Sequence, residues 1–261
     1  MRPIQDIDKG TLSGIKFICT DIDDTLTRDG KLKPEAYQAL WSLHDADLKV
    51  IPVTGRPAGW CDLIARQWPV DAVVGENGAF AFYLEDSFLN HMYFPAIASQ
   101  ESGRRLDELL DVIRKEIPEC RVSKDQFSRK FDLAIDFCEE PPDLGFETAQ
   151  RIAALCELHG ATAKISSIHV NAWFGSYTKV DMLSHYLSER WDISPADQKI
   201  SVFYCGDSPN DEPMFEQFPL SCAVANITPM LHLIKVKPTY ITEGANGAGF
   251  AELANIILSD R

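Results

Sequence analysis

The chain lacks hydrophobic runs long enough to cross a membrane, and basic residues are few relative to acidic ones. No stretch approaches the roughly 18 consecutive apolar residues of a membrane span, which excludes a membrane ATPase. The 261 residues include 25 Lys and Arg against 39 Asp and Glu, for a net charge of −14. Nonspecific nucleic-acid binding and attachment to an anionic membrane surface both depend on basic residues, so we expect neither kind of partner.

Patterns of cysteine and histidine that mark metal or redox sites are also missing. The seven cysteines are scattered, with an odd count and no C-x-x-C pair. The six histidines show no H-x-H or H-x-x-x-H spacing, so a zinc site is not expected. The first 14 residues lack the apolar segment of a signal peptide. We therefore expect a cytoplasmic protein with reduced cysteines, and the sequence leaves open whether it is a monomer or a homodimer.

What the chain does contain is an alternation of strand and helix patterns at both ends. The elements expected before residue 80 are strands at 15–20, 49–53 and 72–74 and helices near 34–46 and 57–67. Those expected in the last third are helices near 179–190, 209–215 and 248–258 and strands at 200–205 and 220–224. This alternation is typical of an α/β fold in which helices cover a parallel sheet.

The middle of the chain has a different pattern. The elements expected there are helices near 99–115 and 145–158 and strands near 131–137, 162–166 and 168–173. The last two strands are close enough to form a hairpin, which favours an antiparallel sheet. We therefore predict a Rossmann-like α/β core domain of residues 1–83 and 174–261, interrupted by an inserted α+β domain of residues 84–173.

Four polar stretches follow predicted strands or begin a predicted helix. C-T-D-I-D-D-T-L-T at 19–27 follows the first strand, T-G-R at 54–56 follows the second, and G-D-S-P-N-D at 206–211 follows strand 200–205. Lys179 begins a helix after Thr178, a residue type that favours the N-cap position. Each stretch alone is more often a turn, a cap or a loop. Their combination at strand ends predicts a ligand site, because ligands of open parallel sheets bind there.

In this order the stretches resemble the four motifs of the haloacid dehalogenase (HAD) superfamily. E-N-G-A at 76–79 resembles a segment common in its type IIB, or Cof-like, sugar-phosphatase branch. The inserted α+β domain is similar in size and position to the C2B-type cap of that branch, which includes sucrose-phosphate phosphatase-like proteins. Asp24 stands where the family often has Gly, and Val180 follows the lysine where many relatives have Gly.

The resemblance implies a Mg²⁺-dependent phosphoric monoester hydrolase that acts through an aspartyl-phosphate. Asp21 would be the nucleophile, Asp23 the acid and then the base, and Lys179 the neutralising cation. The other phosphate or substrate contacts implied are Thr54 and, around it, Ile22, Thr25, Gly55, Arg56, Asn77 and Asn171. The Mg²⁺ ligands implied are Asp21, Asp23, Asp207, Asn210 and Asp211.

Several of these residues have a second interpretation. Arg56 either contacts substrate or forms a salt bridge that ties its loop, and residues 76–77 either line the pocket or bond within their loop. In an alternating strand His169, Asn171 and Trp173 share one face. That face either recognises a sugar or packs between the two domains.

The substrate expected is a small phosphorylated metabolite, with sugar phosphates considered first. One alternative is a phosphosugar mutase similar to phosphomannomutases, which would need basic cap residues for a second phosphate. Arg129 and Lys130 either meet such an anionic group or lie in solvent. The other alternative is a HAD-fold protein that is catalytically idle and binds a partner.

Overall fold

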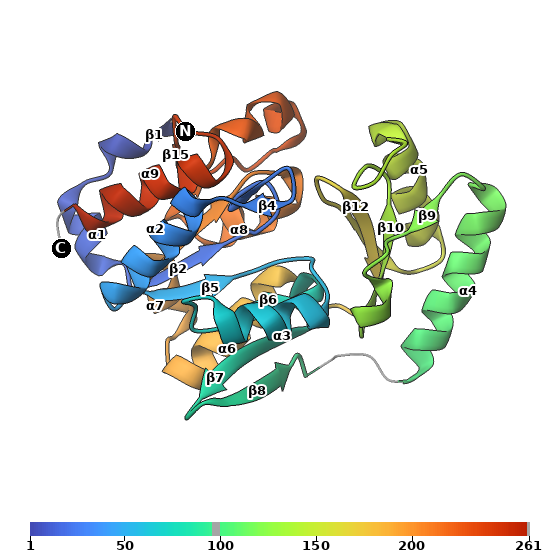
Figure 1. Cartoon of the computed structure of the whole chain (residues 1–261), viewed down its shortest axis with the longest axis horizontal. Helices are drawn as coiled ribbons and strands as arrows, with labels where there is room; N and C mark the ends of the chain where they lie inside the picture. The colour runs from blue at the N-terminus through green and yellow to red at the C-terminus, as the bar shows by residue number, and fades with distance from the viewer. Residues whose placement is uncertain (96–99, 260–261) are drawn as a thin grey trace.

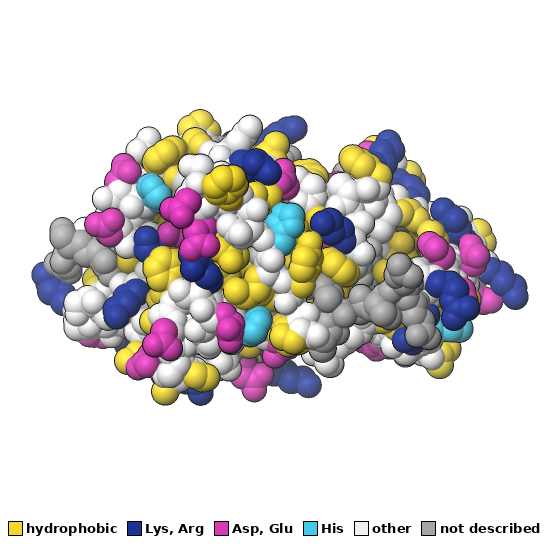
Figure 2. Space-filling view, turned by 90° about the horizontal axis from the view of Figure 1, so that it is seen from below, with side chains coloured by type: hydrophobic (Ala, Val, Ile, Leu, Met, Phe, Trp, Pro, Cys, Tyr) yellow, Lys and Arg dark blue, Asp and Glu magenta, His cyan; other side chains and the backbone are white. Residues whose placement is uncertain are grey.

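The computed structural model describes residues 1–95 and 100–259, and these form two lobes of unequal size (Figure 1). The larger lobe, the core, contains the N-terminal and C-terminal parts of the chain. The smaller lobe, the cap, lies to the right in Figure 1 and contains the residues between them. Figure 2 shows hydrophobic, acidic and basic side chains interspersed over one face of both lobes. Within the described residues, no helix is both long enough and apolar enough to span a membrane.

A six-stranded parallel sheet forms the centre of the core, with strand order β1-β15-β14-β13-β2-β5. Its strands are Arg2–Pro3 (β1), Phe17–Thr20 (β2), Lys49–Pro52 (β5), Val202–Gly206 (β13), Ser221–Ala223 (β14) and Tyr240–Ile241 (β15). From β2 the chain moves to β5 on one side and later returns on the other side at β13. The carboxyl ends of β2 and β13 therefore flank the switch point at which ligands of such sheets bind.

Helices cover both faces of this sheet. They are Lys9–Gly14 (α1), Pro34–Asp45 (α2), Ala58–Gln67 (α3), Lys179–Trp191 (α6), Pro195–Ser201 (α7), Glu212–Gln217 (α8) and Asn246–Leu258 (α9). Buried side chains of α2, α3 and α9 pack in one core cluster, and those of α6 and α8 pack in another. Strand β2 contributes Ile18 to the first cluster and Cys19 to the second. This burial on both faces explains why Phe17, Ile18 and Cys19 of this strand are all apolar.

A hairpin that the sequence did not predict extends the core. Strands β6 (Val73–Gly75), β7 (Phe80–Glu85) and β8 (Phe88–Tyr93) form an antiparallel sheet, joined to the main sheet by a bridge next to β5. The sequence-based domain boundary at residue 84 lies inside this hairpin. We propose that the first core segment extends to Phe94, because that side chain packs against both core clusters.

The cap is a four-stranded antiparallel sheet, order β11-β12-β10-β9, packed against two helices. Its elements are Gln100–Glu116 (α4), Arg121–Val122 (β9), Asp132–Asp136 (β10), Gly145–Leu158 (α5), Thr162–Ile165 (β11) and His169–Trp173 (β12). Leu133, Ile135 and Val170 point into the cluster with α4 and α5. Because side chains alternate along a strand, the polar residues between them face the core. The predicted α/β class, with a parallel core sheet and an α+β insert, is confirmed.

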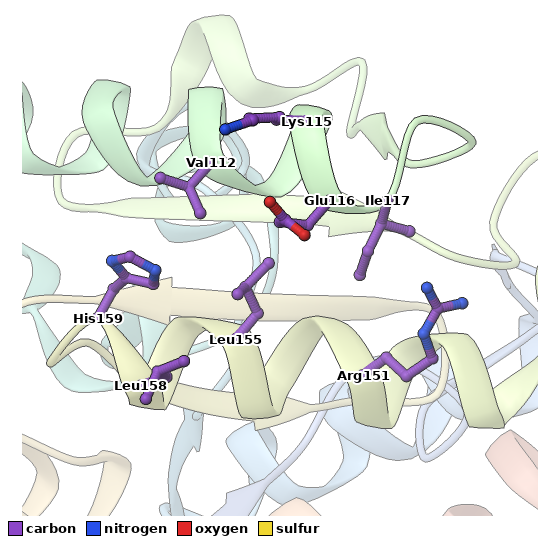
Figure 3. Close-up of a pocket in the computed structure, with 8 residues that line it drawn as sticks. All are labelled: Val112, Lys115, Glu116, Ile117, Arg151, Leu155, Leu158 and His159. Carbon is purple, nitrogen blue, oxygen red and sulfur yellow. The ribbon is translucent and has the colours of Figure 1, made fainter.

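Helices α4 and α5 also border a pocket of about 570 Å³ (Figure 3). Val112 and Lys115 of α4 line one side, and Leu155 of α5 and His159 line the other. None of the residues that the motifs single out lines this pocket.

Candidate active site

Three buried carboxylates meet at the carboxyl ends of β2 and β13. Asp21 follows β2, and its N–H donates to the Cys205 carbonyl at 2.9 Å, which continues the strand pairing. Asp207 follows β13, and Asp211 ends the short helix η4 (Pro209–Asp211). One oxygen from each of the three carboxylates lies within 4.8 Å of the others, and their exposures are 5%, 1% and 0%. The predicted strand ends therefore bring these acids together.

Burial and crowding raise the pKa of two of these acids, Asp21 and Asp207. Burial raises the pKa of Asp21 to about 7, with repulsion from Asp211 and Asp23 adding to the rise and Lys179 opposing it. Burial also raises the pKa of Asp207 well above its usual range, with repulsion from Asp211 and Asp21 adding to it. Burying ionised carboxylates is costly unless cations compensate them. The cluster thus offers hard oxygen ligands and an excess of negative charge, which fits a divalent cation such as Mg²⁺.

Lys179 supplies one positive charge at this cluster. Its Nζ donates to Asp21 Oδ1 at 2.9 Å and to Asp211 Oδ1 at 3.2 Å. Lys179 begins α6, and the hydroxyl of Thr178 caps that helix by accepting from the N–H of Asp181. The predicted N-cap is therefore confirmed. The two carboxylates raise the pKa of Lys179 against the opposing effect of burial, so it stays charged.

Gly78 permits the approach that places Lys179. Its φ is +108°, and a Cβ at this position would lie 2.0 Å from the Thr178 carbonyl oxygen and 2.8 Å from the Lys179 nitrogen. Gly78 belongs to the E-N-G-A segment. Steric constraints therefore explain why this position of the segment is glycine, since only glycine fits both the backbone conformation and the close contact.

We expect Gly78→Ala to destabilise the protein by about 3 kcal/mol and to lower kcat about 100-fold. The methyl group must displace the start of α6, and Lys179 moves with it. Gly103→Ala in α4 is the matched control, because a Cβ there meets nothing within 4 Å. Urea unfolding and steady-state kinetics of both variants measure the two effects. Equal behaviour of the two variants would contradict this role for Gly78.

Asp211 holds the loop after β13 in place, and both oxygens of its carboxylate accept hydrogen bonds. Its Oδ1 accepts from Lys179 and from the Tyr204 hydroxyl at 2.6 Å. Its Oδ2 accepts from the N–H groups of Asp207 at 3.0 Å and Ser208 at 3.3 Å. Asp211 thus positions Lys179 and Asp207. Asn210 Oδ1 accepts from the Ser208 hydroxyl at 2.6 Å, and its role as a further ligand stays a prediction.

Asp207 is held by residues that the motifs only partly reveal. Its Oδ1 accepts from the Thr25 hydroxyl at 3.0 Å, and its Oδ2 accepts from Asn226 Nδ2 at 3.1 Å. Asn226 and Asn246 also donate to the carbonyl of Asp24. Asp24 has a φ of +58°, a conformation that Gly adopts freely and that Asp tolerates. This explains why Asp can stand here, where the resembling family often has Gly. Neither asparagine lies in a recognisable pattern, so sequence reasoning missed both.

Arg56 binds Asp23 and also the cap. Its Nε lies 3.0 and 2.9 Å from the two carboxylate oxygens of Asp23, and its Nη2 donates to Oδ1 at 2.7 Å. Its Nη1 donates to Glu139 of the cap at 2.9 Å and lies 3.5 Å from Asp125. A hydrogen bond with His169 at 2.7 Å, together with Arg56, lowers the pKa of Glu139 to about 2. Of the two interpretations of Arg56, the structure has the salt bridge, and it joins the lobes.

Hydrogen-bond donors surround the space next to Asp21. Thr54 is fully buried and its hydroxyl accepts from the Arg56 N–H at 3.0 Å, so the hydroxyl proton is available to another group. Among the described residues, no group accepts from the backbone N–H of Ile22, Asp23 or Gly55. These donors lie in the two loops that follow β2 and β5. Backbone donors of this kind bind the oxygens of an anion.

The polar face of the cap sheet closes over the Gly55 loop. Asn77 of the core and Asn171 of the cap both donate to Asp132 Oδ2, at 3.2 and 3.0 Å. The side chain of Arg129 is fully buried, and it donates to Asp132 and to the Gly55 carbonyl, each at 2.9 Å. The expectation that Arg129 lies in solvent is wrong, because Asp132 neutralises it in the interface. Asp132 was missed, since a single acid at a strand start carries no pattern.

Glu76 links the lobes through backbone groups. Its Oε1 accepts from the N–H of Ala58 at 2.9 Å, and its Oε2 accepts from the N–H of Phe131 at 2.6 Å. Lys130 of the cap donates its N–H to both oxygens, at 3.0 and 3.1 Å. Burial and the nearby Asp132 raise the pKa of Glu76 to about 7. Glu76 therefore bonds to loops of both lobes rather than lining a pocket.

The metal-free protein is expected to lose stability as the pH rises from about 4 to about 7. The pKa of Asp21 rises from its ordinary 3.8 to about 7 in the fold, so the folded state holds a proton that the unfolded chain has lost. Mg²⁺ should replace that proton and raise the melting temperature more at pH 8 than at pH 5.5. Thermal unfolding with Mg²⁺ or EDTA at both pH values measures this. An equal gain at the two pH values would contradict a metal site at Asp21.

Comparison with known proteins gives one family match. Residues 18–113 match the model of the haloacid dehalogenase-like hydrolases. That segment includes the acidic loop after β2, the T-G-R loop after β5 and the E-N-G-A segment. No curated protein matches the chain.

Solved structures resemble the whole chain in fold. The sucrose-phosphatase from Synechocystis, solved with sucrose and phosphate, is 16% identical with a TM-score of 0.63, and the match covers 92% of this chain and 97% of that one. A HAD superfamily phosphatase from Bacteroides thetaiotaomicron is 19% identical with a TM-score of 0.64, covering 96% and 97%. A HAD subclass IIB sugar phosphatase is 14% identical with a TM-score of 0.65, covering 94% and 100%. Residues 18–113 thus match the haloacid dehalogenase-like hydrolases, and the whole chain shares the fold of these solved structures.

Proposed function

We propose that the chain is a Mg²⁺-dependent phosphatase that hydrolyses a small phosphorylated metabolite through an aspartyl-phosphate on Asp21. The observation that carries the proposal is the meeting of Asp21, Lys179 and Asp207 beside unused backbone donors at the switch point of the sheet. Sugar phosphates are the first substrates to test. Two of the proteins similar in fold support this choice, a sucrose-phosphatase and a subclass IIB sugar phosphatase.

Asp21 is arranged for attack on phosphorus. Its Oδ1 is held by Lys179, and its Oδ2 accepts no hydrogen bond from a described residue. In the proposed reaction Oδ2 bonds to phosphorus as the bond to the leaving alcohol breaks, and Asp23 gives that alcohol a proton. Water then attacks the aspartyl-phosphate and gives its proton to Asp23, which releases phosphate and restores Asp21. Thr54 and the N–H groups of the two loops hold the phosphate oxygens meanwhile.

Mg²⁺ would be held by Asp21, Asp207 and the backbone carbonyl of Asp23, and it would supply positive charge to the phosphate oxygens. Asp211 keeps Lys179 and Asp207 in place without binding the phosphate itself, since both its oxygens are engaged. In this proposal Asp21 and Lys179 contact the phosphate, and Asp211 orients Lys179 and Asp207.

The cap takes part through Arg56. Both oxygens of Asp23 are bound by Arg56, which also binds the cap residue Glu139. Delivery of a proton from Asp23 therefore requires Arg56 to give up at least one oxygen. We propose that movement of the cap and the availability of Asp23 are linked in this way, as lid closure completes the site in other enzymes.

The face formed by His169, Asn171 and Trp173 lies between the lobes. His169 is bound to Glu139, and Asn171 is bound to Asp132. Trp173 belongs to a core cluster and donates its Nε1 to the Tyr177 carbonyl at 3.2 Å. Interdomain packing therefore accounts for Trp173, while Asn171 remains a proposed substrate contact beside the Gly55 loop.

The phosphatase proposal is preferred to the mutase, because two basic cap residues near the core, Arg121 and Arg129, are paired with cap acids and are not free to hold a second phosphate. Arg121 lies 3.4 Å from Asp136, and Arg129 binds Asp132. The assembled cluster of acids and lysine argues against a catalytically idle protein. A cytoplasmic location stays part of the proposal, supported by the seven free cysteines. A monomer and a homodimer both remain open.

Phosphate release from a panel of sugar phosphates and p-nitrophenyl phosphate tests the proposal. The assays are run with Mg²⁺ and with EDTA. We expect release that depends on Mg²⁺ and saturates with at least one substrate. Absence of release from every compound, or release that EDTA leaves undiminished, would contradict the proposed function. Interconversion of sugar 1- and 6-phosphates in the presence of a sugar bisphosphate would instead indicate the mutase.

A further inference from the structure

Lys164 lies on the face of the cap sheet that meets the core. It is in β11, directly opposite Asn171 of β12 in the antiparallel pairing. Residues directly opposite one another in such a pair share a face, so Lys164 points to the same side as Asn171. Its neighbours Ala163 and Ile165 pack on the other side, within the cap cluster.

Two adjoining pockets are bordered by Lys164. The smaller, of about 70 Å³, is lined by both Lys164 and Lys179, with Asn77 and Trp173 beside them. The larger, of about 350 Å³, lies between cap and core, and Lys164 and Asn210 line both pockets. The smaller pocket adjoins the acidic cluster through Lys179, which binds Asp21, and Lys164 lies on the cap side of that pocket.

Lys164 is exposed, and its ammonium has no partner within the part of the chain that the structure describes. Three other basic cap residues have an acidic partner: Lys124 binds Glu140 at 2.7 Å, and Arg121 and Arg129 bind cap acids. An unpaired cation that shares a pocket with Lys179 is most favourably placed when an anionic group lies near it.

We propose that Lys164 binds a second anionic group of the substrate. The preferred substrates would then be phosphate monoesters whose leaving group carries a carboxylate or another phosphate, such as phosphorylated hydroxy acids, sugar acids or sugar bisphosphates. This inference rests on the proposed function and adds a substrate class to it. Neutral sugar phosphates would react at the same centre but leave Lys164 without a partner.

Matched pairs of substrates test the inference. We would compare kcat/KM for 3-phosphoglycerate with glycerol 3-phosphate, and for 6-phosphogluconate with glucose 6-phosphate. Glucose 1,6-bisphosphate against glucose 6-phosphate separates a second phosphate from a carboxylate. We expect the anionic member of at least one pair to be preferred about ten- to a hundredfold, as expected for a hydrogen bond to a charged group.

The variant Lys164→Met should reduce that preference about tenfold or more, chiefly through KM, and Lys164→Arg should restore most of it. Lys124→Met is the control, because Lys124 is on the cap surface and lines neither pocket. A wild type that prefers the neutral members, or a Lys164→Met preference equal to that of the wild type, would overturn the inference alone. Failure of the wild type to hydrolyse any ester would overturn both the proposed function and this inference.

Discussion

Asp21→Asn should reduce phosphate release at least about 1,000-fold while leaving the metal-free protein as stable as the wild type or more stable. An amide oxygen cannot form the aspartyl-phosphate, and it is a poorer ligand for Mg²⁺. The amide matches the carboxylate in shape, and its oxygen can still accept from Lys179. The substitution also removes one of three buried carboxylates that repel one another. Burial chiefly, with this repulsion adding to it, raises the pKa of Asp21 to about 7.

The neighbouring acid provides the matched control. Asparagine, like aspartate, tolerates the positive φ of residue 24, and this residue lies outside the buried cluster of Asp21, Asp207 and Asp211. The rate of phosphate release by Asp24→Asn should therefore fall less than about tenfold. Steady-state kinetics and thermal unfolding in EDTA give both readouts. Loss of activity accompanied by loss of stability in Asp21→Asn would point to a structural role for Asp21 instead. Comparable losses of activity in the two variants would contradict the choice of nucleophile.

Lys179→Met should lower kcat about 1,000-fold and destabilise the metal-free protein by about 3–5 kcal/mol. Lys179 is buried and binds two of the three acids, so its removal leaves Asp21 and Asp211 without their cation. The stability effect should shrink when Mg²⁺ is present, since the metal supplies charge to the same cluster. Lys31→Met in the exposed strand β4 (Lys31–Leu32) is the control and should be near neutral in both measurements.

A double variant separates this charge effect from lost packing. If Lys179 acts by neutralising Asp21, then adding Asp21→Asn to Lys179→Met should restore part of the lost stability. Urea unfolding of the two single variants and the double variant gives the coupling energy. Strict additivity of the two changes would show that the ammonium and the carboxylate do not interact as the structure indicates.

Much of the site was predictable because its chemistry lies in short segments at strand ends. The acidic loop after β2, the T-G-R loop and the G-D-S-P-N-D loop each follow an apolar strand, so their order along the chain located the site. Long helices with regular apolar spacing were also predictable, as α5 (Gly145–Leu158) shows. Local pattern suffices where the functional residue and the element that positions it are neighbours in sequence.

Features that depend on contacts between distant residues were not predictable. Arg56 meets Glu139 across 83 residues, and nothing near either residue indicates the pairing. The β7–β8 hairpin joins the core through β6, although the alternation of predicted strands and helices assigned most of the hairpin to the insert. The strand expected to start at Ile200 starts at Val202, because Ser194 caps a helix that Pro195 begins and that runs to Ser201. The sequence contains this cap pattern, but the prediction gave more weight to the apolar residues from Ile200 onward and therefore missed the helix.

Trapping of the covalent intermediate tests the central claim most directly. Wild-type protein mixed with its best substrate and Mg²⁺ is quenched in acid, treated with borohydride to reduce any acyl phosphate, and digested for mass spectrometry. The account predicts homoserine in place of Asp21 in the peptide that follows β2, and none when Mg²⁺ is withheld. Turnover without a modified aspartate, or modification at Asp23 or Asp207 instead of Asp21, would contradict it.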